Sequence, residues 1–257
     1  MSVTASRIHA SATVHPDAQL AESVVVGANV VVEADVVVAE NSELLTGTVL
    51  HGGARVGKNC RLGPYTVVGG TPMDANFSGE PSFAVLEDNI VLREFVTVHR
   101  ATGEGAVTKV GAGTLAMTYA HISHNVQVGQ SCTLTTGVQL GGHCEVGDFA
   151  VIGSMAVLHQ FCRVGAYAMY GAGSAANQDI LPYSLARGNP AKHYRLNRVG
   201  LQRRGISKEA YDGLEQAIRA CRKRDWTRLE ALAETNEHVR VMLEFKASSK
   251  RGICSFV

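Results

Sequence analysis

The sequence lacks an excess of charge of either sign. Among its 257 residues, 24 are Lys or Arg and 23 are Asp or Glu, which gives a formal net charge of +1 at pH 7. This balance argues against a general nucleic-acid-binding protein, which needs a basic surface, and against a disordered acidic chain. We therefore expect a folded protein that does not act on nucleic acid.

Signals for metal knuckles, disulfides and membranes are also missing. The six cysteines include no CxxC pair, which argues against a zinc knuckle or a disulfide framework and favours reduced thiols packed in a core. The first ten residues show no basic segment followed by an apolar one, so no secretory signal is evident. Glu33 and Asp35 interrupt the most apolar stretch. We expect a cytoplasmic protein without membrane insertion.

What the chain does contain is an aliphatic residue at every sixth position. One series runs from Ile8 to Val68, and the register returns over residues 86–98 and again from Val110 to Tyr170. A small or β-branched residue stands two positions earlier in most repeats, and because side chains alternate along a strand, both members of each pair point inward. A period of six excludes a helix. It predicts a mainly β fold, a left-handed parallel β-helix of hexapeptide repeats with three strands to a coil.

Glycine marks one corner of this predicted triangle. Gly111, Gly129, Gly147 and Gly165 recur every 18 residues, the length of one coil. We expect glycine there because it tolerates the unusual backbone angles of a tight corner. Stacked coils are about 4.7–4.9 Å apart, so residues 18 apart should be neighbours on the surface.

Two segments break the six-residue period, and the period ends after Pro190. Residues 69–85 and 99–108 are predicted to be loops that leave the β-helix, a common place for substrate contacts. A plausible N-cap at Ser207 is followed by apolar residues at helical spacing. The sequence thus predicts a β-helix over residues 1–190 and a C-terminal helical domain over residues 191–257.

The basic residues are concentrated near the C-terminus. From Arg187 onward there are 16 Lys or Arg residues and 8 Asp or Glu residues. We expect this region to face an anionic partner.

Histidines cluster where consecutive coils should meet. Stacking by 18 places His124 beside Gly142 and Gln160, with His143 and His159 in the same corner, and His121 lies in the same run. A neutral imidazole can accept a proton from a hydroxyl group while that oxygen attacks a carbonyl. The backbone N–H of Gly142, with no side chain in the way, can then donate to the oxyanion.

Two other interpretations of this cluster remain open. Three imidazoles can hold Zn²⁺ with an open position for water, as in hexapeptide-repeat carbonic anhydrases. Alternatively, the chain is a trimeric scaffold without catalytic activity.

Several motifs resemble those of the UDP-N-acetylglucosamine O-acyltransferase family, which begins lipid A synthesis. The resemblance covers nearly the whole chain, and its most specific segments are Val96 to Arg100 (VTVHR), Ala120 to Asn125 (AHISHN), Gly141-Gly142-His143, Val157 to Cys162 (VLHQFC), Gln178-Asp179, Pro182-Tyr183, Gly200 to Gly205 (GLQRRG) and Lys250-Arg251-Gly252.

This resemblance implies a role for each matching residue. His124 would be the general base and the Gly142 N–H the oxyanion donor, while His121, His143, His159 and Gln160 would line the sugar and acyl-pantetheine cleft. Asp74 would bind the sugar hydroxyls, and Asn197, Arg203 and Arg204 the nucleotide and its phosphates. Ala172 stands where members vary a side chain to limit acyl length, and its small size implies a 3-hydroxyacyl group of medium length.

The resemblance also implies partners but no cofactor and no metal. The acyl group would arrive on acyl carrier protein, an acidic co-substrate that the basic C-terminal region could attract. The acceptor would be a UDP-sugar, and the protein would be a homotrimer with active sites between subunits.

Four positions depart from the family pattern. Met73 and Asn76 stand where the family has an amide and a cation near the sugar, and Val199 replaces a glutamate. These changes leave open N-acyl transfer to a 3-amino nucleotide sugar beside O-acyl transfer. Asn125 replaces an aspartate that follows the base in many members, and its amide can orient the imidazole but adds no negative charge.

Overall fold

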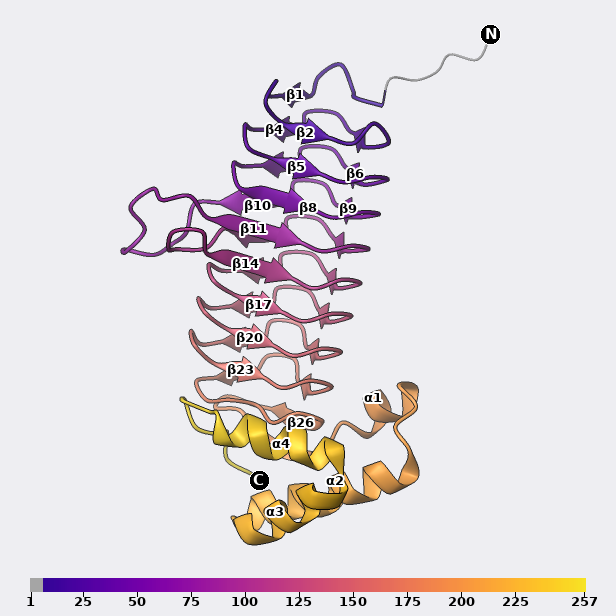
Figure 1. Ribbon diagram of the computed structural model, residues 1–257, viewed down its shortest axis with the longest axis vertical. Coiled ribbons are helices and arrows are strands. Elements are labelled where there is room, and N and C mark those ends of the chain that lie inside the picture. The colour runs from indigo at the N-terminus through magenta and orange to yellow at the C-terminus, as the bar shows by residue number, and fades with distance from the viewer. Residues whose placement is uncertain (1–6) are drawn as a thin grey trace.

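The structure is a three-sided coil of short parallel strands with four helices at its C-terminal end (Figure 1). It is a computed structural model that describes residues 7–257. We number the three sheets in the order in which the chain visits them, and we name each corner by the sheets it joins. The predicted hexapeptide β-helix, followed by C-terminal helices, is confirmed.

Sheet 1 contains β1 (Thr13–Val14), β4 (Val31–Val32), β7 (Val49–Leu50), β10 (Val67–Gly70), β13 (Thr97–His99), β16 (His121–Ile122), β19 (Gln139–Leu140), β22 (Val157–Leu158) and β25 (Ala175–Ala176). Sheet 2 contains β2 (Gln19–Leu20), β5 (Val37–Val38), β8 (Ala54–Val56), β11 (Phe83–Leu86), β14 (Val107–Val110), β17 (Gln127–Val128), β20 (Glu145–Val146) and β23 (Arg163–Val164). Sheet 3 contains β3 (Val25–Val26), β6 (Glu43–Leu44), β9 (Arg61–Leu62), β12 (Val91–Leu92), β15 (Leu115–Ala116), β18 (Thr133–Leu134), β21 (Val151–Ile152), β24 (Met169–Tyr170), β26 (Ser184–Arg187) and β27 (Lys192–Leu196).

The core is a column of aliphatic side chains inside the coil. Leu44, Leu134 and Ile152, three of the sixth-position residues, are fully buried, and so are most partners two positions earlier. All six cysteines are buried and unpaired, as predicted. Burial of these side chains supplies the main favourable free energy of folding for a coil whose strands are two to five residues long.

The predicted 18-residue stacking is confirmed by the strand register. His121 pairs with Gln139, and Gln139 pairs with Val157. The spacing is wider where loops are inserted, so that Val67 pairs with Thr97, and Thr97 with His121. Both loops leave corner 1–2, after β10 at residues 71–82 and after β13 at residues 100–106, and they project from the same side of the coil (Figure 1).

The expected reason for the glycine column is wrong. Gly129 and Gly147 do not have positive φ; the left-handed residues of this corner stand two positions later and include Phe149 and Tyr167, with φ of 61° and 59°. The cause is close stacking instead. A Cβ on Gly147 would lie 2.5 Å from the backbone N of Ala166 in the next coil, so only glycine fits.

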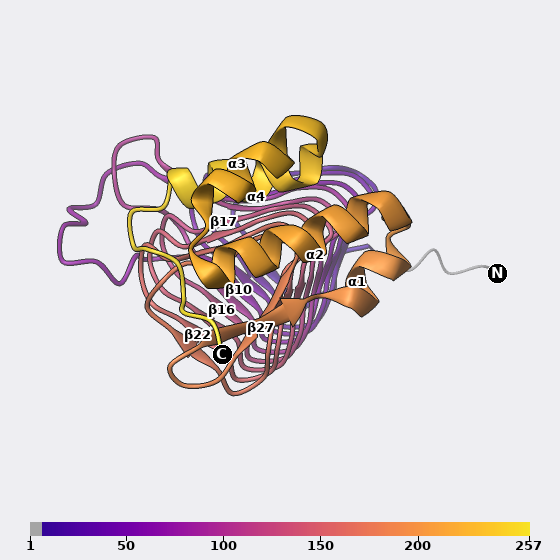
Figure 2. The same ribbon diagram turned by 90° about the horizontal axis from the view of Figure 1, so that it is seen from below.

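Four helices cover the C-terminal end of the coil (Figure 2). They are α1 (Arg198–Arg203), α2 (Lys208–Lys223), α3 (Trp226–Thr235) and α4 (Glu237–Ala247). Ser207 caps α2 as predicted, its hydroxyl oxygen accepting the N–H of Ala210 at 3.2 Å. Within residues 7–257, no helix has the length and apolar character needed to cross a membrane.

Candidate active site

The histidine corner forms where two turns of corner 1–2 stack. His124 lies in the turn after β16 and Gly142 in the turn after β19, so the register places them in adjacent coils. A Cβ on Gly142 would lie 2.5 Å from Nε2 of His124. The imidazole therefore lies directly against Gly142, and any side chain at residue 142 would displace it.

The backbone N–H of Gly142 has no hydrogen-bond partner among residues 7–257. The same turn position in four other repeats donates its N–H to a carboxylate oxygen at 2.8–3.1 Å: Gly52 to Glu33, Lys58 to Asp88, Ala112 to Glu87 and Gln130 to Asp148. The N–H at this position of the turn therefore binds anionic oxygen. At Gly142 it is available to a substrate.

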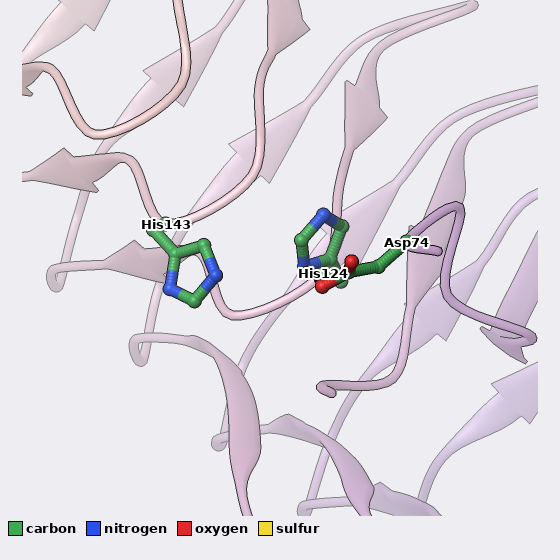
Figure 3. A group of neighbouring side chains, drawn as sticks. All are labelled: Asp74, His124 and His143. Carbon is green, nitrogen blue, oxygen red and sulfur yellow. Dashed lines mark ion pairs between the residues drawn. The ribbon is translucent and has the colours of Figure 1, made fainter. Parts of the chain in front are cut away.

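Asp74 reaches this corner from the 71–82 loop (Figure 3). Its Oδ2 lies 3.7 Å from Nδ1 of His124, and both side chains are largely buried. The backbone N–H of Asn76 donates to Asp74 Oδ1 at 3.0 Å and lowers the pKa of that carboxyl, although burial opposes the shift. Asp74 is thus an anion beside the imidazole at neutral pH.

His143 completes the group in Figure 3. Its ring stacks on Phe161 at 4.6 Å and meets the ring of His124 edge to face at 5.2 Å. Burial, with a further contribution from His124, lowers its pKa. One ligand atom from each of Asp74, His124 and His143 lies within 4.8 Å of the other two. A divalent cation could bind between these three atoms.

His121 lies three residues before His124, in β16. Its Nδ1 is 2.7 Å from Oγ1 of Thr97. Burial, together with His99 and His124, lowers the pKa of His121 to about 4. It is therefore a neutral polar group close to His124 at neutral pH.

Gln160 stacks one coil beyond Gly142, as expected, but His159 does not join the other two histidines. Of the three histidines expected to converge, only His124 and His143 do so. His159 stacks one coil beyond Gly141 instead, and its Nδ1 lies 3.1 Å from Nη2 of Arg251. Gln160 is exposed in the turn after β22. The sequence did not predict the Arg251 contact, because the C-terminal segment returns to the corner only in the folded chain.

The predicted nucleotide-binding residues lie at another corner. Asn197 caps α1, accepting the N–H of Gly200 at 3.2 Å and donating to the carbonyl of Tyr167 at 2.9 Å, so both ends of its amide have partners within the chain. Arg204 lies over the ring of Phe149 at corner 2–3, and Arg203 is exposed beside it. Figures 1 and 2 show α1 on the side of the coil opposite the 71–82 loop.

Three of the departures from the family pattern lie on the surface of these elements, and so does Ala172. Met73 is 67% exposed, and the amide of Asn76 donates to Asp74 Oδ1 at 3.0 Å. Val199 is exposed on α1. Ala172 is exposed in a turn of corner 3–1, after β24.

A hexapeptide-repeat coil with an imidazole against a backbone N–H that has no partner among residues 7–257 is the arrangement expected of a hexapeptide-repeat acyltransferase. A sequence profile described as "Udp N-acetylglucosamine O-acyltransferase; Domain 2" matches residues 179–254. The acyl-[acyl-carrier-protein]–UDP-N-acetylglucosamine O-acyltransferase of Thermodesulfovibrio yellowstonii is 35% identical over 256 residues, 97% of this chain and 99% of that protein. The enzyme of the same name from Paraburkholderia phytofirmans is 38% identical over 96% of this chain and 99% of its own length.

Solved structures agree. The UDP-N-acetylglucosamine acyltransferase of Campylobacter jejuni superposes with a TM-score of 0.89 at 33% identity, over 97% of this chain and all of that one. That of Francisella novicida gives a TM-score of 0.93 at 31% identity, over 96% of this chain and 94% of that one. The chain belongs to the UDP-N-acetylglucosamine O-acyltransferase family.

Proposed function

We propose that this protein transfers a 3-hydroxyacyl group from acyl carrier protein to the 3-hydroxyl of UDP-N-acetylglucosamine, in the synthesis of lipid A. The observation that carries the proposal is the contact between His124 Nε2 and Gly142, whose N–H has no partner in the described part of the chain. The chain also matches enzymes of this name over nearly its whole length.

The reaction needs no covalent enzyme intermediate. Nε2 of His124 takes the proton of the sugar hydroxyl while that oxygen attacks the thioester carbonyl carbon. The Gly142 N–H donates to the oxyanion that forms. The carbon–sulfur bond then breaks, and the imidazolium returns the proton to the leaving thiolate, which releases acyl carrier protein with a free thiol.

The position of Asp74 suits the second substrate. Its carboxylate can accept hydrogen bonds from the sugar hydroxyls and also stabilises the imidazolium that forms at His124. His121 and His143 are biased toward their neutral forms, so they can line the cleft without repelling that imidazolium.

A trimer would bring the two halves of the site together. The outward residues of sheets 1 and 3 are mostly uncharged in the C-terminal half, for example Val151, Met169 and Val157, whereas sheet 2 presents Lys109, Glu145 and Arg163. A threefold axis along corner 3–1 would pack sheet 1 of one copy on sheet 3 of the next. Corner 1–2 of one subunit would then meet corner 2–3 of its neighbour.

Corner 3–1 carries the surface expected at such an axis. Tyr65, Phe95 and Tyr119 stack on one another at 5.3 and 5.0 Å and are 53%, 42% and 57% exposed in the single chain. A second and a third copy would cover this ladder of rings. His124 of one subunit would then face Arg203 and Arg204 of the next, which hold the phosphates of the nucleotide. The acyl chain would run inward between the sheets toward Ala172.

Incubating the purified protein with acyl carrier protein thioesters of several lengths, and with UDP-N-acetylglucosamine or its 3-amino analogue, tests this function directly. We expect mass spectrometry to show a 3-hydroxyacyl group of medium length on the acceptor and free carrier thiol in equal amount. No product with any combination would contradict the proposal and leave the scaffold interpretation. Product formed only with the 3-amino analogue would make that sugar the acceptor, an alternative that the departures at Met73 and Asn76 leave open.

The purified protein also tests the zinc alternative, because Asp74, His124 and His143 place ligand atoms close enough together to hold a divalent cation. We expect the protein purified without chelator to contain no stoichiometric zinc and to keep its rate in EDTA. One zinc per chain whose removal abolishes turnover would overturn the role of His124 as base.

A further inference from the structure

A cavity of about 570 Å³ lies at the C-terminal end of the molecule, and none of the predicted site residues lines it. It forms between the end of α2, the start of α3, the last turn of α4 and the segment of residues 249–257, which lie together beyond the last coil (Figures 1 and 2). Its volume falls within the range of about 300–1,000 Å³ that is usual for small-molecule sites. The cavity is therefore large enough to hold a ligand.

The walls of this cavity are held by the fold itself. Arg224 ends α2 with a φ of 56°, and Asp225 caps α3 by accepting the N–H of Arg228 at 3.1 Å. This tight turn places Trp226 beside the end of α2. On the opposite wall, two β-bridges hold the segment of residues 249–257 to the coil. Both walls are thus in place without a ligand.

The floor of the cavity is apolar and uncharged. Leu181, Cys221 and Cys254 are buried there, and Trp226 and Phe256 add aromatic rings to the walls. Burial raises the pKa of the Cys221 thiol to about 11 and that of Cys254 to about 12, so both thiols are neutral at neutral pH. This floor suits an alkyl chain.

The rim of the cavity is basic. Arg222, Arg224 and Lys246 line it, and the lining includes no aspartate or glutamate. No carboxylate within residues 7–257 forms an ion pair with any of these three side chains. The ammonium of Lys246 lies 4.2 Å from the centre of the Trp226 ring, so one cation is held directly above an aromatic wall. The rim thus carries three positive charges without a counterion from the chain.

We propose that this cavity binds an amphipathic anion, a molecule with an alkyl chain and a single carboxylate or phosphate head. The chain lies on the apolar floor, and the head lies among the three cations of the rim. A nucleotide is disfavoured, because thiols and an aliphatic side chain offer the edge of a base only weak hydrogen bonds. The site is separate from the histidine corner and does not depend on the proposed function.

Trp226 is the only tryptophan of the chain, so its fluorescence reports on this cavity. The whole protein is titrated with decanoate, decyl phosphate, decanol and inorganic phosphate, each below the concentration at which it forms micelles. We expect saturable changes with the two amphipathic anions, about tenfold weaker binding of decanol, and no change with inorganic phosphate. Each methylene removed from the chain should weaken binding by up to about fourfold.

The two anions distinguish the source of the ligand. Tighter binding of decyl phosphate would identify a phosphorylated lipid, and tighter binding of decanoate a fatty acid, and either result supports the site. No saturable change with either anion would overturn the proposal. So would decanol binding as tightly as both, because the cations would then have no role.

Arg224→Asn/Lys246→Gln removes two of the three cations. Asparagine tolerates the left-handed backbone of residue 224, and Arg222 is kept because its Nη2 donates to the carbonyl of Tyr194 at 2.7 Å. Binding of decanoate, measured by calorimetry because Lys246 also contacts Trp226, should weaken about tenfold. It should also become less sensitive to salt.

Lys208→Gln/Lys223→Gln is the matched control, because it removes two exposed cations of α2 that do not line the cavity. It should leave the affinity for decanoate unchanged. Equal affinities of the two double variants would contradict the role of the rim. If Arg224→Asn/Lys246→Gln fails to fold, the comparison of decanoate with decanol in the unmodified protein decides the same point.

Discussion

The chemistry of this protein is set by the few atoms around one imidazole. Nε2 of His124 lies against Gly142, whose N–H is unpaired among the residues that the structure describes, and Nδ1 lies beside the amide of Asn125 and the carboxylate of Asp74. Each of these neighbours comes from a different turn or loop. The side chain itself lies outside the aliphatic core, so function and folding are largely separable at this residue.

His124→Ala should therefore abolish transfer while leaving the fold intact. Loss of the base should lower kcat about 10²- to 10⁴-fold. Circular dichroism and the thermal midpoint should stay close to those of the unmodified protein. His15→Ala, which removes a half-exposed histidine from the same corner 1–2, serves as control and should leave kcat unchanged. A His124→Ala protein with the original rate would mean that another residue is the base.

At the scale of elements, the C-terminal region is joined to the coil through buried polar contacts. Asp179 is 1% exposed, pairs with Arg163 at 3.2 Å and accepts the hydroxyl of Ser249 at 2.7 Å. His193 of β27 is fully buried: its Nε2 accepts the N–H of Leu181 at 3.0 Å, and its Nδ1 donates to the carbonyl of Cys254 at 2.8 Å. Acceptance at Nε2 requires a neutral imidazole, with its hydrogen on Nδ1.

Burial lowers the pKa of His193 to about 4, from an ordinary value of 6.5. Between these pH values the unfolded chain binds a proton that the folded chain does not, so the free energy of unfolding should fall as pH falls through this window. Replacing His193 by Gln should remove on the order of 2 kcal/mol of this pH dependence. Denaturant titrations at pH 7.5 and 4.5, followed by the fluorescence of Trp226 in α3, measure it.

The exposed His9 provides the comparison for this measurement. His9→Gln should keep the pH dependence of the unmodified protein, because it leaves His193 in place. Carboxylates that titrate in the same window are common to the unmodified protein and both variants, so their contribution cancels in the comparison. Equal slopes for the His193→Gln and unmodified proteins would show that His193 is not held neutral in the folded state.

At the scale of the whole molecule, the single chain divides its predicted site between corners. His124 lies at corner 1–2, Arg204 at corner 2–3 and Ala172 at corner 3–1. No bending of a rigid three-sided coil can bring these corners together. In the proposed trimer, the symmetric packing of three copies would do so.

Mixed trimers test this packing. Co-expressing a His124→Ala chain with an Arg203→Ala/Arg204→Ala chain should restore about a quarter of the original sites, since each restored site takes His124 from one chain and both arginines from the other. Turnover should be measured at low nucleotide sugar, where each parent is weak. His124→Ala mixed with Gly142→Val damages the same corner twice and should restore nothing. Mixed trimers without activity in the first pair would place the whole site within one subunit.

Much of this protein could be derived from its sequence. A strict six-residue period determines the coil, because strands this short bury their side chains only by stacking, and an 18-residue coil then places His124 against Gly142. The reason for the glycine column could not be derived in the same way, because it depends on the distance between backbones in adjacent coils.

Only the tertiary structure decided what surrounds the base. Asp74 and Thr102 reach it from loops that follow no repeat, and Arg251 returns from the C-terminal segment to His159. A repeat specifies contacts between neighbouring coils, since each residue has a fixed partner one coil away. A loop has no such partner, and where its side chains come to rest depends on the packing and hydrogen bonds of the completed fold.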